Sequence, residues 1–140
     1  MKAERALLEW IPVSSRLCAV WLDGSVRVNN NKLKRRCLFV VSVYAPTDCI
    51  SSETKDESYQ DLSQLLRNAR STDVVVIAGE FNTQFGHLGD SERHIGGSFV
   101  VPTDGLIQLC SDHRLFMASA TLCHKKGHRL TWRPPSSSQR

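Results

Sequence analysis

Two polar residues that follow the most apolar segment of the chain have side chains suited to phosphate or metal chemistry. Glu80 and Asn82 stand in the motif Gly-Glu-Phe-Asn at 79–82, directly after the apolar run 73–78. A carboxylate there can hold a hard cation or orient a water, and an asparagine amide can donate to a phosphate oxygen while its carbonyl is fixed by the backbone. Ligands commonly meet the carboxyl ends of strands in open sheets. Both residues are also frequent in turns, so a plain loop is the alternative.

A tyrosine ends the other strongly apolar segment. Residues 37–44 read Cys-Leu-Phe-Val-Val-Ser-Val-Tyr, a run of β-branched and aromatic residues that predicts a buried strand stopping before Pro46. The hydroxyl of Tyr44 could reach a phosphate from that position. A tyrosine that caps the core and keeps its hydroxyl in water is the commoner use of a strand end, and the residues alone leave both interpretations open.

The elements expected around these residues predict an α/β fold. Apolar residues spaced three and four apart indicate an amphipathic helix between the two strands, and Thr54 and Glu57 fit a capping box at its start. The run 73–78 is typical of a strand covered on both faces. The order strand, helix, strand favours helices packed against a sheet. The apolar helix residues are Tyr59, Leu62, Leu65, Leu66 and Ala69.

Weaker patterns fill the rest of the chain. In order, they predict a short helix over 3–10, a strand over 16–23 ending at the turn Asp23-Gly24, a loop over 79–102, a short helix around 106–110, and weak strands over 115–118 and 130–133. The polar, proline-containing end, 135–140, is expected to be a disordered tail.

Size and composition predict one folded domain, over 1–134. The chain has 140 residues, of which 41% are hydrophobic and 23% charged, as in typical globular domains. Its apolar runs are too short to span a membrane, and the N-terminus lacks a signal-peptide pattern. We therefore expect an intracellular protein, nuclear or cytoplasmic, that is not secreted and has no membrane partner.

Charge and cysteine content bear on the partners. The net charge is +4, which permits a polyanionic partner without requiring one. Five cysteines without a Cys-x-x-Cys pair fit neither a closed disulfide framework nor a zinc ribbon, so we expect mostly buried thiols. The clustered basic residues are Lys32, Lys34, Arg35 and Arg36.

Two further groupings resemble chemical sites. Cys123, His124 and His128 would present zinc ligands on one face of a helix, but the segment contains glycine and no helix is predicted there. The tripeptide 111–113 reads Ser-Asp-His, like a hydrolytic dyad. Adjacent residues on a helix face different directions, so we interpret this tripeptide as incidental.

Several of these segments, in order, resemble the endonuclease/exonuclease/phosphatase superfamily. The similarity is greatest to the apurinic-endonuclease-like domains that accompany reverse transcriptase in non-LTR (LINE-like) retrotransposons, and to the craniofacial development protein group. It covers residues 3 to 134. The similar segments are 6–13 with Arg16-Leu17, the Tyr-Ala-Pro signature in 43–47, the strand and Gly-Glu-Phe-Asn block in 73–86, 93–97, Asp104-Gly105 and Thr131-Trp132.

The resemblance implies a two-sheet α/β sandwich with outer helices and Mg²⁺-dependent cleavage of phosphodiester bonds, with water attacking phosphorus. It implies that Glu80 orients or activates the nucleophile, that Asn82 contacts the phosphate, and that Tyr44 lies near it. The family has aspartate at the position of Glu80, whose additional methylene displaces the carboxylate by roughly 1 Å. The family's main metal-binding glutamate and its catalytic histidine would lie outside residues 1–140.

We therefore expect a partial, retrotransposon-derived DNA endonuclease domain that is weak or inactive alone and has no metal ligand that the sequence identifies with confidence. DNA is the expected partner of an active form. A non-catalytic nucleic-acid-binding module that uses the basic cluster is the alternative, and a zinc-binding fragment is the third hypothesis. The oligomeric state is left open by the sequence.

Overall fold

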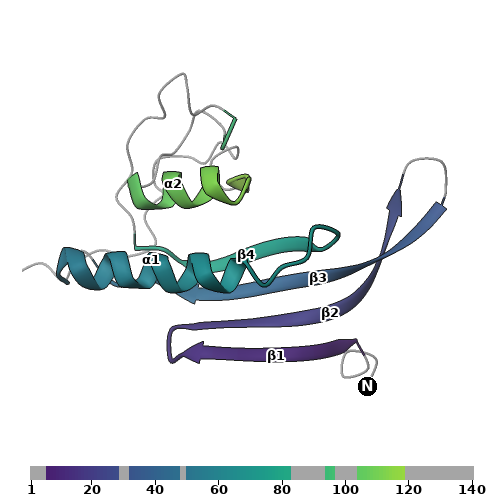
Figure 1. The fold of residues 1–140 in the computed structure, drawn as a ribbon, viewed down its shortest axis with the longest axis horizontal. Coiled ribbons are helices and arrows are strands. Elements are labelled where there is room, and N and C mark those ends of the chain that lie inside the picture. The colour runs from purple at the N-terminus through teal and green to yellow at the C-terminus, as the bar shows by residue number, and fades with distance from the viewer. Residues whose placement is uncertain (1–5, 29–31, 48–49, 83–93, 97–103, 119–140) are drawn as a thin grey trace, which may run out of the picture.

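The computed structural model describes residues 6–28, 32–47, 50–82, 94–96 and 104–118. Within these ranges the chain forms one mixed four-stranded sheet and two helices (Figure 1). The α/β class is confirmed, whereas the second sheet of a sandwich stays a prediction. The elements are β1 (Leu7–Ser14), β2 (Leu17–Val28), β3 (Lys32–Tyr44), α1 (Ser52–Leu66), β4 (Val74–Glu80) and α2 (Asp104–Asp112).

The strands lie side by side in chain order, β1-β2-β3-β4. The first three are antiparallel neighbours, and β4 runs parallel to β3. Parallel neighbours need a crossover connection because their ends lie at opposite edges of the sheet, and α1 supplies it. The expected order of strand, helix and strand is confirmed.

The N-terminal part of the sheet corrects two expectations. Residues 7–10 belong to a strand, because Trp10 and Ile11 pair with Val20 and Ala19 of β2. A short isolated helix is marginal in water, and the pairing supplies backbone partners along the whole segment. The turn expected at 23–24 is also wrong: Gly24 pairs with Arg36, and β2 continues to Val28.

Alternate residues of the strands face the two helices and form the core with them. Phe39 is 0% exposed and Leu62 of α1 is 1% exposed. The ring of Trp21 lies 4.8 Å from that of Phe39, centroid to centroid. Leu17, Ala19 and Trp21 lie on one face of β2, since all three belong to or pack against this core.

Helix α1 begins one turn earlier than its expected capping box. Ser51 is the N-cap, and its side chain accepts a hydrogen bond from the backbone N–H of Thr54. This bond satisfies one of the donors that the first turn of a helix leaves without a partner. Thr54 therefore lies inside the first turn, where its hydroxyl is 3.2 Å from that of Ser51.

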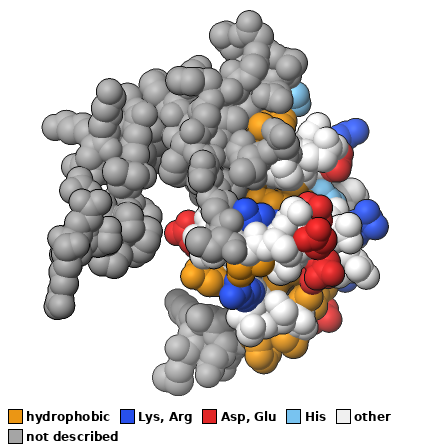
Figure 2. Space-filling model, turned by 90° about the vertical axis from the view of Figure 1, so that its left-hand side faces the viewer, with side chains coloured by type: hydrophobic (Ala, Val, Ile, Leu, Met, Phe, Trp, Pro, Cys, Tyr) orange, Lys and Arg blue, Asp and Glu red, His pale blue; other side chains and the backbone are white. Residues whose placement is uncertain are grey.

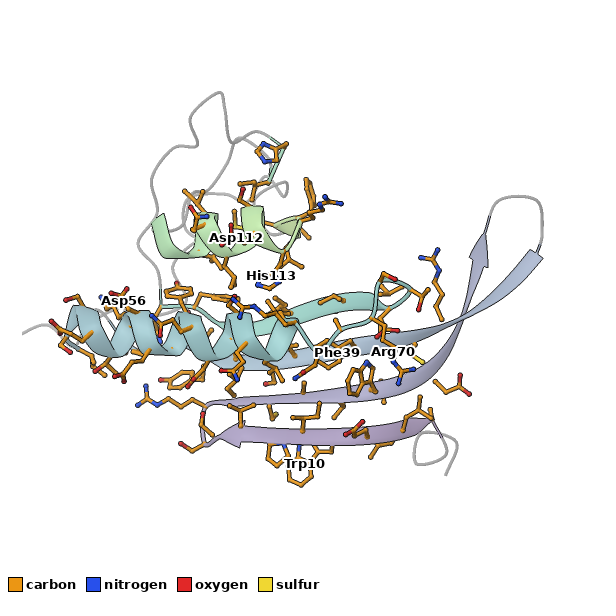
Figure 3. All side chains as sticks on the ribbon, viewed as in Figure 1. Trp10, Phe39, Asp56, Arg70, Asp112 and His113 are labelled. Carbon is orange, nitrogen blue, oxygen red and sulfur yellow. The ribbon has the colours of Figure 1, made fainter. Side chains whose placement is uncertain are left out.

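The other face of the sheet has no helix over it in the described ranges. Val76 is 41% exposed and Trp10 is 63% exposed, and Figure 3 shows Trp10 pointing away from the helices. The expectation that 73–78 is covered on both faces is wrong for the described structure. No described helix is long and apolar enough to cross a membrane.

The later elements agree only in part with the sequence. Helix α2 is confirmed, and its Leu106, Leu109 and Cys110 are buried. The weak strand at 115–118 is reduced to an isolated bridge between Met117 and Gly96. Of the cysteines, Cys110 is buried, whereas Cys18 and Cys37 are partly exposed; all three are free thiols. The structure does not describe Cys49, Cys123, the expected strand at 130–133 or the expected tail at 135–140.

The position of Phe39 at the centre of the core predicts a large cost for removing its ring. We expect Phe39→Ala to lower the free energy of unfolding by about 3–5 kcal/mol, because the surrounding side chains cannot fill the cavity. Trp10→Ala is the control, since an exposed side chain contributes about 0.5 kcal/mol or less. Urea unfolding measures both values, and equal losses would show that Phe39 is not central.

Burial of Cys110 predicts a pH dependence of stability. Burial raises the pKa of the Cys110 thiol from 9.0 to about 11, so folding disfavours the thiolate. The contribution of the protonated Cys110 thiol to the free energy of unfolding is present below pH 9 and is lost as pH rises toward 11. We expect the unfolding free energy to fall less over this interval in Cys110→Ala than in the wild type, when both are followed by urea titration. If plots of unfolding free energy against pH were parallel for the two proteins, Cys110 would not be the cause of this pH dependence.

Candidate functional site

The parallel pairing of β3 and β4 brings Tyr44 and Glu80 together at one edge of the sheet. They are the last pair in the register, and paired positions of neighbouring strands direct their side chains to the same face. That face is the one without helices, because the neighbouring Val43 is buried in the core. Tyr44 is 50% exposed and Glu80 is also exposed, so both can meet a ligand from solvent.

Asn82 joins this pair through the backbone. Its Nδ2 donates to the carbonyl oxygen of Ala45 at 2.6 Å, and its own N–H donates to Oε1 of Glu80 at 3.3 Å. The N–H of Ala45 also donates to the carbonyl oxygen of Glu80 at 2.8 Å. The three residues singled out in the sequence therefore form one group at the carboxyl ends of β3 and β4.

The orientation of the Asn82 side chain corrects one expectation. We expected the side-chain carbonyl to be fixed by the backbone. The backbone group it meets is a carbonyl oxygen, which only accepts hydrogen bonds, so the side-chain nitrogen must face it. The second N–H of that nitrogen is left to donate to a phosphate oxygen, and Oδ1 is left to accept.

Asn82 also has a left-handed backbone, with φ of 47°. Asparagine adopts this region more readily than most residues that carry a Cβ, because its short polar side chain bonds locally. Unusual backbone conformations of this kind cluster at functional sites. The conformation turns the chain directly after β4 and returns the Asn82 side chain to the end of β3.

Gly79 determines how closely the two strands approach. Its φ is 152°, and a Cβ at this position would lie 1.8 Å from the carbonyl oxygen of Val43. No side chain can be accommodated at that distance without moving the backbone. The glycine of the Gly-Glu-Phe-Asn motif is thus needed for the pairing that places Glu80 beside Tyr44.

Arg16 is a member of the group that sequence reasoning missed. Its guanidinium carbon lies 5.5 Å from the centre of the Tyr44 ring, and its carbonyl oxygen accepts from the N–H of Tyr44 at 2.8 Å. No local sequence pattern predicts this contact, because it depends on the turn between β1 and β2 and on the β2–β3 register. Arg16 supplies a positive charge next to the tyrosine.

The site's residues do not form a complete magnesium centre. Glu80 provides a carboxylate and Asn82 an amide oxygen, whereas Mg²⁺ is usually held by one or two carboxylates together with further oxygens in near-octahedral geometry. No group of three His, Cys, Asp or Glu that could hold a metal occurs among the described residues. The described residues of this site therefore do not fit a magnesium ion by themselves. The zinc hypothesis rests on Cys123, His124 and His128, which lie outside the described ranges.

The tripeptide 111–113 does not form a dyad. Asp112 accepts from Nε2 of Gln108 at 2.7 Å, whereas Nε2 of His113 lies 2.8 Å from the hydroxyl of Ser63 on α1. The two side chains have different partners, as expected for neighbours on a helix. The histidine instead joins the end of α2 to α1.

Comparison with known proteins gives no match: no family model, no curated protein and no solved structure is similar to this chain. The family interpretation therefore depends on the ordered motifs of the sequence. The geometry at the ends of β3 and β4 is an observation independent of those motifs.

The backbone of Asn82 predicts different effects for two substitutions. Both Asn82→Gly and Asn82→Ala lose the hydrogen bond to Ala45. Glycine also removes the Cβ, whereas alanine keeps a Cβ in the left-handed region without a polar side chain that bonds locally, which costs roughly 1–2 kcal/mol. We expect the alanine variant to be less stable than the glycine variant by about 1 kcal/mol in thermal or urea unfolding. A glycine variant no more stable than the alanine variant would contradict the left-handed conformation.

Proposed function

We propose that this chain is part of a retrotransposon-derived, Mg²⁺-dependent DNA endonuclease domain of the endonuclease/exonuclease/phosphatase type, weak or inactive alone. The observation that carries this proposal is the grouping of Tyr44, Glu80 and Asn82 at one sheet edge. These are the residues to which the resemblance assigns the phosphate side of the reaction. Their proximity is what a shared phosphodiester substrate requires.

The group suits a phosphodiester placed against the sheet edge. The remaining side-chain N–H of Asn82 and the hydroxyl of Tyr44 can donate to its non-bridging oxygens, and Arg16 balances its charge. The Glu80 carboxylate can orient a water toward phosphorus and accept its proton as the new P–O bond forms. The bond to the leaving oxygen then breaks, and that oxygen takes the electron pair.

Two features of the site limit the rate of this reaction. The carboxylate of Glu80 lies one methylene farther from the backbone than an aspartate would, and a misplacement of about 1 Å can cost on the order of a hundredfold in rate. The bound Mg²⁺ would neutralise charge on the phosphate and leaving oxygen, but it needs ligands beyond Glu80 and Asn82. Residues outside the described ranges, or a longer chain, would have to supply them.

The weak-activity proposal is tested by nicking of supercoiled plasmid and of an abasic-site duplex in Mg²⁺. We expect the wild type to cut no faster than Glu80→Ala and Asn82→Ala, because the described residues offer the metal and the leaving oxygen no further partners. Clear cleavage that both substitutions abolish would contradict it and show a working centre.

The phosphate role is tested separately by binding. We expect Asn82→Ala to raise the Kd for the abasic duplex by about tenfold, the effect of losing one hydrogen bond to a charged group. Asn68→Ala, an exposed asparagine after α1, is the matched control and should leave Kd unchanged. Equal Kd values for both variants and the wild type would remove the support for an endonuclease-type site.

The alternative function, a non-catalytic nucleic-acid-binding module, is favoured by a second observation. Exposed arginines gather at the end of the sheet opposite to Glu80. This function predicts salt-sensitive binding that survives Glu80→Ala.

A further inference from the structure

A cavity of about 1070 Å³ lies along the outer edge of β4, between that strand and the segment that follows α2. Strand β4 is the last in the sheet order, so no described strand pairs with this edge. The cavity is lined by residues 75–79 of β4 with Phe81, by the end of α1 with its following turn, by the buried face of α2, and by residues 112–118. Tyr44, Glu80 and Asn82 do not line it.

Three arginines line this cavity: Arg67, Arg70 and Arg114. They come from the ends of α1 and α2, which the contact between Ser63 and His113 at 2.8 Å holds together (Figure 3). All three arginines are exposed. Arg114 is distant in sequence from Arg67 and Arg70, and all three line the same cavity.

Two acidic residues, Asp73 and Asp112, line the same cavity, and the hydrogen bonds they accept come from neutral donors. Oδ2 of Asp73 accepts from Nε1 of Trp21 at 3.0 Å and from the backbone N–H of Arg70 at 2.9 Å. Asp112 accepts from Gln108. Among the described residues, Arg67 and Arg114 form no ion pair, and the Arg70 guanidinium lies over the Trp21 ring at 5.8 Å. The three arginines outnumber the two carboxylates, so the lining keeps a small positive excess that an anionic ligand can neutralise.

The basic run of the sequence lies at the start of β3. Residues 32–37 of β3 pair only with β2, because pairing with β4 begins at Leu38 and Val74. Since β3 and β4 are parallel, the run extends beyond the start of β4, in the part of the β2–β3 hairpin that projects past the helices (Figure 1). The opposite end of the molecule is different, and Figure 2 shows a group of acidic side chains there.

An exposed aromatic ring accompanies the arginines. Phe116 lines the cavity and is 60% exposed. Exposed aromatic rings beside cationic groups are typical of sites for single-stranded nucleic acid, where a base stacks on the ring and the backbone follows the positive charge. Bases of a duplex are already stacked and cannot reach such a ring. The cavity is large enough for a ligand of nucleotide size.

From these features we infer that the β4-edge cavity binds single-stranded nucleic acid, with one base stacked on Phe116 and its phosphates on Arg67, Arg70 and Arg114. An acidic peptide would neutralise the arginines but would leave the apolar lining and the exposed ring without a planar partner. This function goes beyond the proposed endonuclease site, because it uses a different cavity and needs neither Mg²⁺ nor Glu80.

The test is fluorescence anisotropy of labelled oligothymidylate with the purified chain, in EDTA, over a range of salt concentrations. We expect Phe116→Ala to raise Kd by about 5- to 100-fold without changing the salt dependence, since it removes stacking and no charge. Phe116→Trp should preserve binding. The double substitution Arg67→Gln, Arg114→Gln should reduce the slope of log Kd against log salt by about 1.4, because two phosphate contacts are lost.

Lys55→Gln is the charge control, because Lys55 lies near the start of α1, away from the arginines. Glu80→Ala should bind oligothymidylate like the wild type. The result at the β4-edge cavity is therefore independent of whether the endonuclease proposal holds. The inference is overturned if Phe116→Ala and the double arginine variant bind no more weakly than Lys55→Gln. Equal affinity for a duplex of the same length, or displacement by polyglutamate as effective as by oligothymidylate, would also overturn it.

Discussion

The close approach of β4 to β3 at Gly79 is the constraint on which the rest of this structure depends. A side chain at this position would collide with the Val43 carbonyl oxygen, so the glycine allows the two strands to pair in the register that ends with Tyr44 and Glu80. A shift by one residue would turn every side chain of β4 to the other face. The core and the polar group at the strand ends therefore depend on the same pairing.

The directions of the strands and helices place the group of Tyr44, Glu80 and Asn82 apart from the arginines of the β4-edge cavity. Because α1 crosses between two parallel strands, it must run opposite to them, and α2 ends beside the end of α1. The carboxyl ends of β3 and β4 carry Tyr44, Glu80 and Asn82, whereas the ends of the helices carry the arginines. A site suited to one phosphodiester and a cavity suited to an unpaired base are consequently at different places on one small fold.

Much of this arrangement follows from local patterns. The strands β3 and β4 and the helices α1 and α2 could be predicted because apolar periodicity is a property of neighbouring residues. Glu80 and Tyr44 could be identified because each stands where a predicted strand ends. Parallel pairing then made their proximity a natural consequence, although the sequence did not specify the register.

The features that escaped prediction depend on contacts between distant segments. Strand pairing with β2 overrides the helix expected at the N-terminus and the turn expected at Gly24. The place of Arg16 beside Tyr44 and the presence of Arg67 and Arg114 around one cavity also require the assembled sheet and helices. The orientation of Asn82 was predicted wrongly because its partner is a carbonyl oxygen of a segment far away in sequence.

The most direct test of the account is the β3–β4 register, measured by nuclear Overhauser effects in isotopically labelled protein. The parallel register of β3 and β4 predicts backbone contacts that join Val43 to Gly79 and Tyr44 to Glu80, together with a side-chain contact from Asn82 to Ala45. Contacts that instead join Tyr44 to Gly79 or to Phe81 would contradict this register. The shifted strand would turn Glu80 toward the helices, so that it could not share a site with Tyr44.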